Sequence, residues 1–482
     1  MASTCSLVRV LILSLCLHLV AAALPAPNQV RSELGPNLSP NAAIYDPTSP
    51  EFGSSTTRWQ QFASPNVSIV VNVHTEDDIV ATILYANKHA VPFLATNGGH
   101  GTFGSLGGLQ NGLLIRLRSM NSITISADGK YATMQGGVSN LDAIQKLDAA
   151  SKQTVTGACE CTGLLGAALG GGHGFQQGRY GLLADNIIDA RVVLATGEVV
   201  NASASTNTDL YWGLKGAGHN FGIVSEFRYK IYDVAPTDLW YTETLIFAKD
   251  QLKAVYTQVN KMMAGTPPPI ILLGIIYNGP ESEAKKYITP FNDLKPLFAS
   301  SLVAPHTALP AITGNDMNSE ICQNGLNRLK FPVGLQTFDV PTLGKIFDTY
   351  SNFTAATPAL NGTILLFEGY SNQAVMAVDE TTTAFPHRRD KIIATPVISF
   401  KPDVSLNEKA IQFGTSVRAM LQSGSKQREL HAYVNYAHGD EELTSLFGYD
   451  VWRRTKLRAL KKKYDVNNRF NWYAPITFGR WG

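Results

Sequence analysis

Short apolar runs rich in β-branched residues, separated by stretches with helical spacing, organise the first part of the chain. Residues 68–73 predict a strand. Thr75 and an acidic turn follow, and apolar residues at helical spacing then predict a helix up to His89. Residues 91–95 predict the next strand. The glycine-rich turn after it therefore ends a β-α-β unit, where α/β sheets commonly bind ligands.

The same pattern continues to about Asp233, after which it changes. Further strands are predicted before that point, together with a helix over 140–151; the strands cover 113–117, 123–125, 131–134, 190–195 and 198–200. Beyond Asp233 the segments are longer and broken by prolines. Strong β runs at 269–277, 364–367 and 392–400, with helical stretches between them, predict an antiparallel sheet with helices on one face. From about Glu429 we expect a strand over 431–436 and a helix over 449–464.

Three glycine-rich stretches stand out, at 97–104, 157–174 and 215–224. Glycine admits positive φ angles and close backbone approach, which a loop that binds an anion needs. Taken alone such loops are common, and a single histidine in one is usually an ordinary loop residue. His173 and His219 have no partners at metal-ligand spacing, so we predict no metal site. The loops also lack the endings of a Walker or G-x-G-x-x-G site.

Length, charge and the N-terminus limit the class of protein. The 482 residues suggest two to four structural units, and the formal net charge of +2 offers no field for nucleic acid. An apolar segment that ends in small residues predicts a signal peptide over 1–23, followed by a lead segment over 24–57. We therefore expect a secreted protein, without a membrane anchor once the signal is removed. N-glycosylation is expected at five sequons, Asn37, Asn66, Asn201, Asn352 and Asn361.

Removal of the signal leaves three cysteines, Cys159, Cys161 and Cys322. Because three is odd, at least one thiol is free or is bonded to something other than cysteine.

In this order, the motifs resemble those of the FAD-linked oxidoreductases of the vanillyl-alcohol oxidase type, and most closely the berberine-bridge-enzyme-like branch in its secreted fungal form. The resemblance covers nearly the whole mature chain. It rests on Asn97-Gly-Gly-His100-Gly, Gly157-x-Cys159-x-x-x-Gly163-x-x-Gly166, Gly170-Gly-Gly172, Tyr180-Gly181 with Asp185-Asn186, Phe221-Gly-Ile-Val224, Tyr433-x-Asn435-Tyr436 and Asp465-x-x-Asn468-x-Phe470.

The resemblance implies an α+β fold. A two-part FAD-binding domain of the PCMH type is expected over 58–233, a substrate-binding domain with an antiparallel sheet covered by helices over 234–428, and a tail over 429–482 that returns to the FAD domain.

The resemblance also implies FAD as cofactor, joined covalently to His100. A second bond through Cys159 is possible, although Glu160 stands where relatives usually have proline. Cys161 and Cys322 are then left as an even pair, and we expect them to be buried free thiols. The other cofactor-binding residues implied are Asn97, Gly98, Gly99, Gly101, Gly163, Gly166, Gly171, Asp185, Asn186, Gly222, Ile223, Val224, Asn435 and Asn468.

Catalytic roles fall, by the same resemblance, on Tyr433 and His173. Tyr433 is expected to act as the base or to orient one, and His173 could do the proton work itself, since an imidazole pKa lies near ~6.5. Ala394 occupies the place of a glutamate base found in some alkaloid-forming members. Thr162 matches the small residue that admits oxygen in relatives, so we expect an oxidase that forms hydrogen peroxide.

We therefore expect a monomeric FAD oxidase that transfers a hydride from a small organic substrate, of the kind met in secondary metabolism, to the flavin, which O2 then reoxidises. Two alternatives stay open. One is an oligosaccharide oxidase acting at the anomeric carbon. The other is a flavin-bearing cyclisation scaffold or binding protein without net redox turnover.

Overall fold

The structure of the protein, a computed structural model, describes residues 25–263 and 272–479. The predicted signal peptide and residues 269–271 of a predicted strand lie outside the described residues. Among the described helices, none is long and apolar enough to cross a membrane.

The N-terminal layer is a four-stranded sheet in the order β1 (Ala43–Tyr45), β2 (Val67–Asn72), β4 (Gly112–Arg116), β3 (Phe93–Thr96). β2, β4 and β3 are parallel, and β1 is antiparallel to β2. Helix α3 (Glu76–Lys88) connects β2 to β3 and begins at a capping box formed by Thr75 and Asp78. The apolar face of α3 packs with β2 and β4 in one core. The predicted β-α-β unit is confirmed, with β4 inserted between its two strands.

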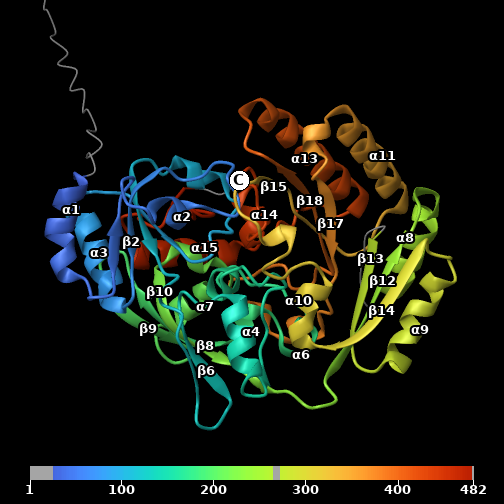
Figure 1. The fold of residues 1–482 in the computed structure, drawn as a ribbon, viewed down its shortest axis with the longest axis horizontal. Helices are drawn as coiled ribbons and strands as arrows, with labels where there is room; N and C mark the ends of the chain where they lie inside the picture. The colour runs from blue at the N-terminus through green and yellow to red at the C-terminus, as the bar shows by residue number, and fades with distance from the viewer. Residues whose placement is uncertain (1–24, 264–271, 480–482) are drawn as a thin grey trace, which may run out of the picture.

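The second layer is a five-stranded antiparallel sheet in the order β5 (Ile123–Ile125), β6 (Tyr131–Gln135), β10 (Ile223–Lys230), β8 (Ile187–Val193), β9 (Val199–Ser203). Helices α4 (Asn140–Asp148) and α7 (Thr208–Ala217) and the tail helix α15 (Val451–Tyr464) contribute side chains to its core. Figure 1 shows the C-terminal α15 lying among the blue and green N-terminal elements. The tail thus returns to the first part of the chain.

The middle region contains two antiparallel sheets where one was expected. β12 (Leu239–Ile246) pairs with β13 (Leu272–Asn278) and β14 (Phe298–Pro305), whereas β18 (Ile392–Phe400) pairs with β15 (Asn327–Lys330), β16 (Val333–Leu335) and β17 (Ile364–Glu368). Helices α11 (Val340–Ala356) and α13 (Val404–Ser425) lie beside β18 and β17, and α8 (Leu252–Met263) and α9 (Glu281–Asn292) lie beside the other sheet (Figure 1).

Short elements complete the fold. They are α1 (Pro27–Leu34), α2 (Phe52–Thr56), α5 (Leu164–Ala168), α6 (Gln177–Tyr180), α10 (Leu309–Ile312), α12 (Gln373–Ala377), α14 (Leu443–Phe447), and the paired strands β7 (Lys152–Gln153) and β11 (Tyr232–Asp233).

The predicted strand over residues 431–436 is wrong. These residues form a turn, in which the Tyr436 N–H donates to the Tyr433 carbonyl at 2.9 Å. The alternation in the sequence is real, because Ala432 and Val434 enter the core beneath the second sheet while Tyr433 joins a small cluster on the other side. The segment therefore lies between two packed surfaces, and such a segment can alternate without a partner strand.

Candidate functional site

His100 lies in the loop after β3, against an aromatic ring. Its imidazole stacks on Trp59 with ring centroids 5.0 Å apart, and its Nδ1 is 3.5 Å from Thr162 Oγ1. Burial, with the nearby charges of Lys330 and Arg328, lowers the pKa of His100 to about 3. The ring is therefore neutral at physiological pH and keeps a nucleophilic nitrogen. The preceding Gly99 has φ +68°, a conformation that explains glycine at this position.

The first two glycine loops meet around His100. A Cβ on Gly98 would lie 3.0 Å from both the Cys161 carbonyl oxygen and the Gly163 nitrogen. Asn97 donates from Nδ2 to the Val138 carbonyl at 2.9 Å, but its Oδ1 is buried without a hydrogen-bond partner among the described residues. Beside Gly166 the protein leaves open space. An unpartnered buried oxygen and open space in one glycine cradle fit a large polar cofactor such as FAD.

The tail brings Tyr433 and Asn435 to the second glycine loop. Asn435 Nδ2 donates to the Ala167 carbonyl and to Tyr433 Oη, both at 2.8 Å. A Cβ on Gly170 would lie 2.1 Å from Asn435 Oδ1, so only glycine fits there. Burial raises the pKa of Tyr433, although Asn435 and neighbouring backbone N–H groups act in the opposite direction.

His173 packs against Tyr433. The two ring centroids are 4.7 Å apart in an edge-to-face arrangement. His173 Nδ1 lies 2.9 Å from Gln177 Oε1; because an amide oxygen only accepts, Nδ1 carries the proton and Nε2 is left as an acceptor. Burial lowers the pKa of His173 to about 4, which makes it a weak base.

The expectation that Cys161 and Cys322 are free thiols is wrong. They form a disulfide with Cα atoms 5.7 Å apart. The sequence could not show this, because 161 positions separate the two cysteines and only the fold brings them together. Cys159 is the free cysteine of the described chain. Burial raises its pKa to about 11, and the positive charge of Lys330 partly opposes this.

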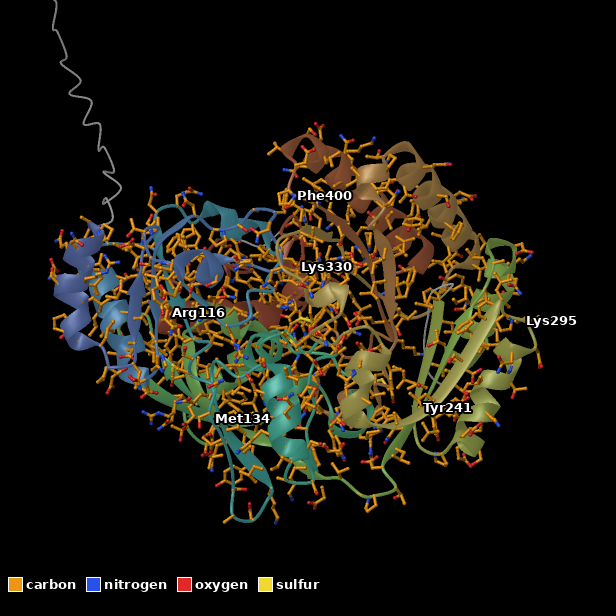
Figure 2. The ribbon with its side chains drawn as sticks, in the orientation of Figure 1. Arg116, Met134, Tyr241, Lys295, Lys330 and Phe400 are labelled. Atoms are coloured by element: carbon orange, nitrogen blue, oxygen red, sulfur yellow. A yellow bond between two sulfur atoms is a disulfide. The ribbon has the colours of Figure 1, made fainter. Side chains whose placement is uncertain are left out.

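Lys330 was not singled out from the sequence. It ends β15 in the interior, close to where the N-terminal layers and the middle region meet (Figure 2). Its Nζ lies 3.8 Å from the ring centroid of Tyr436 and 4.8 Å from that of Trp59. Burial lowers the pKa of Lys330 to about 8. Since its charge affects the pKa of both His100 and Cys159, the imidazole and the thiol are neighbours of one buried amine.

Glu368, at the end of β17, was also missed. Its Oε1 accepts a hydrogen bond from Tyr370 Oη at 2.7 Å, and its Oε2 is buried without a hydrogen-bond partner among the described residues. Ala394, the position compared with a glutamate base, packs with Phe367 in the core on the other face of the sheet. No local signal distinguishes Glu368 from an ordinary surface carboxylate at a strand end.

Glu368 and Tyr370 line a cavity of about 800 Å³ between β12, β13 and β17. Ala158, next to Cys159, lines the same cavity. Aromatic and polar side chains share the wall, among them Phe175, Trp240, Thr242, Glu243, Tyr277 and Tyr287. The cavity therefore suits a molecule with an apolar body and a few hydrogen-bonding groups.

Two of the predicted cofactor residues, Asp185 and Asn186, use their polar groups in contacts with other residues of the protein. Asp185 forms a buried ion pair with Arg388 at 2.7 Å. Asn186 donates to the Leu182 carbonyl at 2.8 Å and accepts from Tyr232 Oη at 2.7 Å. Their polar groups connect parts of the protein, and nothing in these contacts points to a ligand.

The remaining predicted cofactor residues are two loop glycines, three consecutive residues where β10 begins, and the tail asparagine. Gly101 has Tyr473 against the position of a Cβ, and Gly171 has φ +101°. Gly222, Ile223 and Val224 are buried at the start of β10. Asn468 has φ +51°, and its Oδ1 is buried without a hydrogen-bond partner in the described part of the chain.

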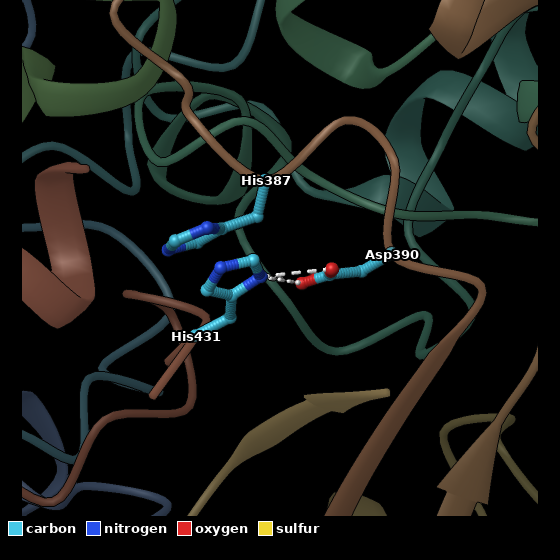
Figure 3. Close-up of side chains that lie close together, drawn as sticks. All are labelled: His387, Asp390 and His431. Atoms are coloured by element: carbon cyan, nitrogen blue, oxygen red, sulfur yellow. Dashed lines mark hydrogen bonds and ion pairs between the residues drawn. The ribbon is translucent and has the colours of Figure 1, made fainter. Parts of the chain in front are cut away.

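Within residues 25–263 and 272–479, one group of side chains has ligand atoms close enough to hold a metal ion. The ligand atoms of His387, Asp390 and His431 all lie within 4.8 Å of one another. Figure 3 shows the two imidazoles stacked, with centroids 4.5 Å apart, and His431 Nδ1 bonded to Asp390 at 2.9 Å. His387 Nε2 lies 2.7 Å from the Ser445 carbonyl. Because stacked rings direct their nitrogens in parallel planes, this arrangement suits a link between the turn before β18 and the tail better than a metal site.

Comparison with known proteins agrees with this geometry. Residues 67–203 match the family model described as an FAD binding domain. The chain is 38% identical over 474 residues to the FAD-linked oxidoreductase anuG of Penicillium roqueforti, covering 94% of this chain and 92% of the relative. It is 39% identical to the FAD-linked oxidoreductase chyH of Penicillium rubens, covering 92% and 93% of the two chains.

Solved structures share the fold at low sequence identity. A BBE-like 1 protein of Physcomitrella patens superposes with TM-score 0.80 at 19% identity, over 94% of this chain and 99% of that one. The glucooligosaccharide oxidase of Acremonium strictum, described with a 6-S-cysteinyl, 8α-N1-histidyl FAD, gives TM-score 0.77 at 19% identity over 93% and 99% of the two chains. The chain belongs to the FAD-linked oxidoreductases, and its fold is that of the PCMH-type FAD-binding proteins of the vanillyl-alcohol oxidase and BBE-like group.

Proposed function

We propose that this oxidoreductase is an oxidase that holds FAD covalently through His100, with a second bond through Cys159, and oxidises a small organic molecule in the cavity beside Glu368. The observation that carries the proposal is the neutral, half-buried imidazole of His100 where two glycine loops meet, with the Cys159 thiol near the same amine, that of Lys330. FAD, when bound, supplies an acceptor for the hydride of a substrate C–H bond.

Proton removal requires a base beside the substrate, and Tyr433, His173 and Glu368 differ in their suitability for that role. Burial raises the pKa of Tyr433, which keeps its phenol protonated at neutral pH, and neither Tyr433 nor His173 lines the cavity, whereas Glu368 does. Tyr433 and His173 then act by positioning Tyr370, which lines the cavity: His173 stacks on Tyr370 and packs against Tyr433. Glu368 receives the proton, directly or through Tyr370, whose hydroxyl already donates to it.

Oxygen use is supported by Thr162. Its hydroxyl lies 3.5 Å from His100 Nδ1, so a small side chain borders the attachment site. We infer that O2 accepts the electrons and becomes hydrogen peroxide. If enzyme reduced by substrate under argon stayed reduced for minutes after mixing with aerated buffer, the oxidase assignment would be wrong.

The remaining features of the proposal concern where and how the protein works. The disulfide is compatible with an oxidising compartment and so supports secretion. That the protein is released from a signal peptide as an N-glycosylated monomer is part of the same proposal. The division into an FAD-binding domain over 58–233, a substrate-binding domain over 234–428 and a returning tail is part of the same proposal.

An oligosaccharide oxidase is the second candidate. Trp240, Tyr277 and Tyr287 give the cavity flat aromatic faces, and a chitooligosaccharide oxidase shares the fold with TM-score 0.78 at 22% identity. Peroxide release from cello-, xylo- and chito-oligosaccharides, measured beside a panel of small phenols and alcohols, separates the two candidates. A scaffold without redox turnover would show no bleaching of the flavin by any of these under argon.

The covalent bonds are tested by precipitating the purified protein with acid and analysing its peptides by mass spectrometry. The expected result is a yellow pellet and flavin on the peptides that contain His100 and Cys159. A colourless pellet with all flavin in the supernatant would contradict covalent attachment.

A further inference from the structure

The segment that carries Cys159 is held against residues 310–322 of the middle region. Cys161 is joined to Cys322 by the disulfide. The Glu160 N–H donates to the Asn315 carbonyl at 3.0 Å, and Glu160 Oε2 accepts from the Met317 N–H at 2.9 Å. A proline at position 160 has no N–H and could not make the first of these bonds.

Asn315 also reaches the thiol itself. Cys159 Sγ lies 3.1 Å from Asn315 Oδ1, within the longer range of hydrogen bonds to sulfur. Asn315 Nδ2 donates to the Thr313 carbonyl at 3.1 Å and to Thr313 Oγ1 at 2.9 Å. These two donor bonds determine which end of the amide faces the sulfur, because only the oxygen is left for the thiol.

The backbone of Cys159 is held from its other side. Asn140 Nδ2 donates to the Cys159 carbonyl at 2.8 Å. With the backbone held there and the S–H directed at Asn315, the thiol is restricted to one of the staggered rotamers that a free cysteine side chain samples.

We propose that Asn315, held in place by the Cys161–Cys322 disulfide and by Glu160, is a positioning residue that directs the Cys159 thiol for the second covalent bond to the flavin. The inference rests on the proposed function, since it requires that this bond forms. It also explains what glutamate rather than proline contributes at position 160, because Glu160 supplies a hydrogen-bond donor and an acceptor to the segment that carries Asn315.

The covalent step balances with dioxygen as the oxidant. Formation of the carbon–sulfur bond breaks the S–H bond of Cys159 and one C–H bond of the flavin ring. Two protons and two electrons leave, and dioxygen takes them up to form hydrogen peroxide. The protein's part is to hold the sulfur in one position while this occurs.

The test compares the proportion of flavin bound to both His100 and Cys159 with that bound to His100 alone, by mass spectrometry of peptides from purified holoenzyme. Asn315→Ala, which leaves the disulfide intact, is expected to reduce the doubly bound fraction at least fivefold while the His100 bond remains. Cys161→Ser/Cys322→Ser, which also prevents exchange with Cys159, should have the same effect. Asn315→Asp keeps an acceptor oxygen but loses the two donor bonds to Thr313, so its doubly bound fraction should lie between those of Asn315→Ala and the wild type.

Asn318→Ala is the matched control, because Asn318 lies in the same segment and its side chain donates to Asp316 at 3.3 Å. It should leave the doubly bound fraction unchanged. A wild-type proportion in both the Asn315→Ala and the double cysteine variants would overturn the inference alone. Flavin on His100 only in the wild-type protein would overturn the proposed second bond and the inference with it.

Discussion

The flavin-binding layers and the middle region encode their contribution to the site in different ways. The flavin-binding layers contribute backbone atoms. Gly171 adopts φ +101° and Gly98 lies against the Cys161 carbonyl, so the backbone geometry requires glycine at both positions. The middle region uses side chains that project from strands, and Glu368 and Glu243 line the cavity from β17 and β12. A site made from backbone leaves a local signature in the sequence, whereas a site made from strand side chains leaves almost none.

The largest effect is expected where the middle region supplies chemistry. Glu368→Gln keeps the size of the side chain and its hydrogen bond from Tyr370 but cannot hold the substrate proton. Loss of a general base typically costs about 10²–10⁴-fold, so kcat for flavin reduction should fall by about that factor. Stopped-flow bleaching of the flavin by substrate under argon measures this step directly.

Glu243→Gln is the control, because this carboxylate lines the same cavity but is already bonded to Tyr241 Oη at 2.6 Å and Asn292 Nδ2 at 2.9 Å. It should change KM more than kcat. Equal losses of kcat in the two variants would show that the middle region acts on the substrate only through general polarity of the cavity.

The next effect concerns the covalent link between the two regions. Cys161→Ser/Cys322→Ser opens a loop of 161 positions, and removal of a native disulfide typically costs about 2–5 kcal/mol of unfolding free energy. The midpoint of denaturant unfolding should fall accordingly. Cys159→Ser, which leaves the disulfide in place, should unfold close to the wild-type midpoint when both proteins are compared without flavin. A double variant as stable as the wild type would mean that the two regions are held together by packing alone.

Local signals explain which parts of the fold could be predicted. The Thr75 cap marks the start of α3, and the β-branched runs at Ile123–Ile125 and Ile392–Phe400 coincide with β5 and β18. The strand predicted over residues 431–436 was wrong because a segment packed between two surfaces shows the same alternation of apolar and polar residues as a strand. The division of the middle strands into two sheets depends on which strands pair, and pairing is a long-range property.

The residues of the candidate site likewise differ in whether a local sequence signal marks them. His100, Asn97, Gly98 and Gly163 could be predicted because motifs name them, and the structure brings them together. Lys330 and Glu368 could not, because a lysine or glutamate at a strand end is ordinarily solvated. Their burial depends on segments that meet only in the folded chain.

Substitutions at Gly170 and Gly166 test which of these two glycines is required by packing within the protein and which by the cofactor. At Gly170 an added Cβ would lie 2.1 Å from Asn435 Oδ1, and such overpacking costs about 1–3 kcal/mol. At Gly166 no atom outside its chain neighbours and the backbone of its own helix lies within 4 Å of that position. Gly170→Ala should therefore lower the melting temperature of flavin-free protein. Gly166→Ala should leave that temperature unchanged and reduce the ratio of flavin to protein absorbance. Full flavin content in Gly166→Ala would show that the open space does not belong to the cofactor.

The smallest effect is expected at the link between the turn before β18 and the tail, and it should depend on pH. Burial lowers the pKa of His431, but its hydrogen bond to Asp390 and the charge of that carboxylate outweigh this and raise the pKa above its usual value. A raised folded-state pKa stabilises the protein below the unfolded value near ~6.5, and the contribution is lost as the pH rises through the folded value. Burial lowers the pKa of the stacked His387 to about 4, so that ring stays neutral over this range.

His431→Gln should therefore destabilise the protein by about 1 kcal/mol or less at pH 5.5, which is the scale of a partly exposed ion pair, and by less still at pH 8.5. Asp390→Asn should remove the same pH-dependent part, because the shift needs both partners. Unfolding free energies of the three proteins at the two pH values measure the difference. A difference in unfolding free energy between wild type and His431→Gln that grows toward alkaline pH would contradict the raised pKa of His431. The link would then depend on packing rather than on charge.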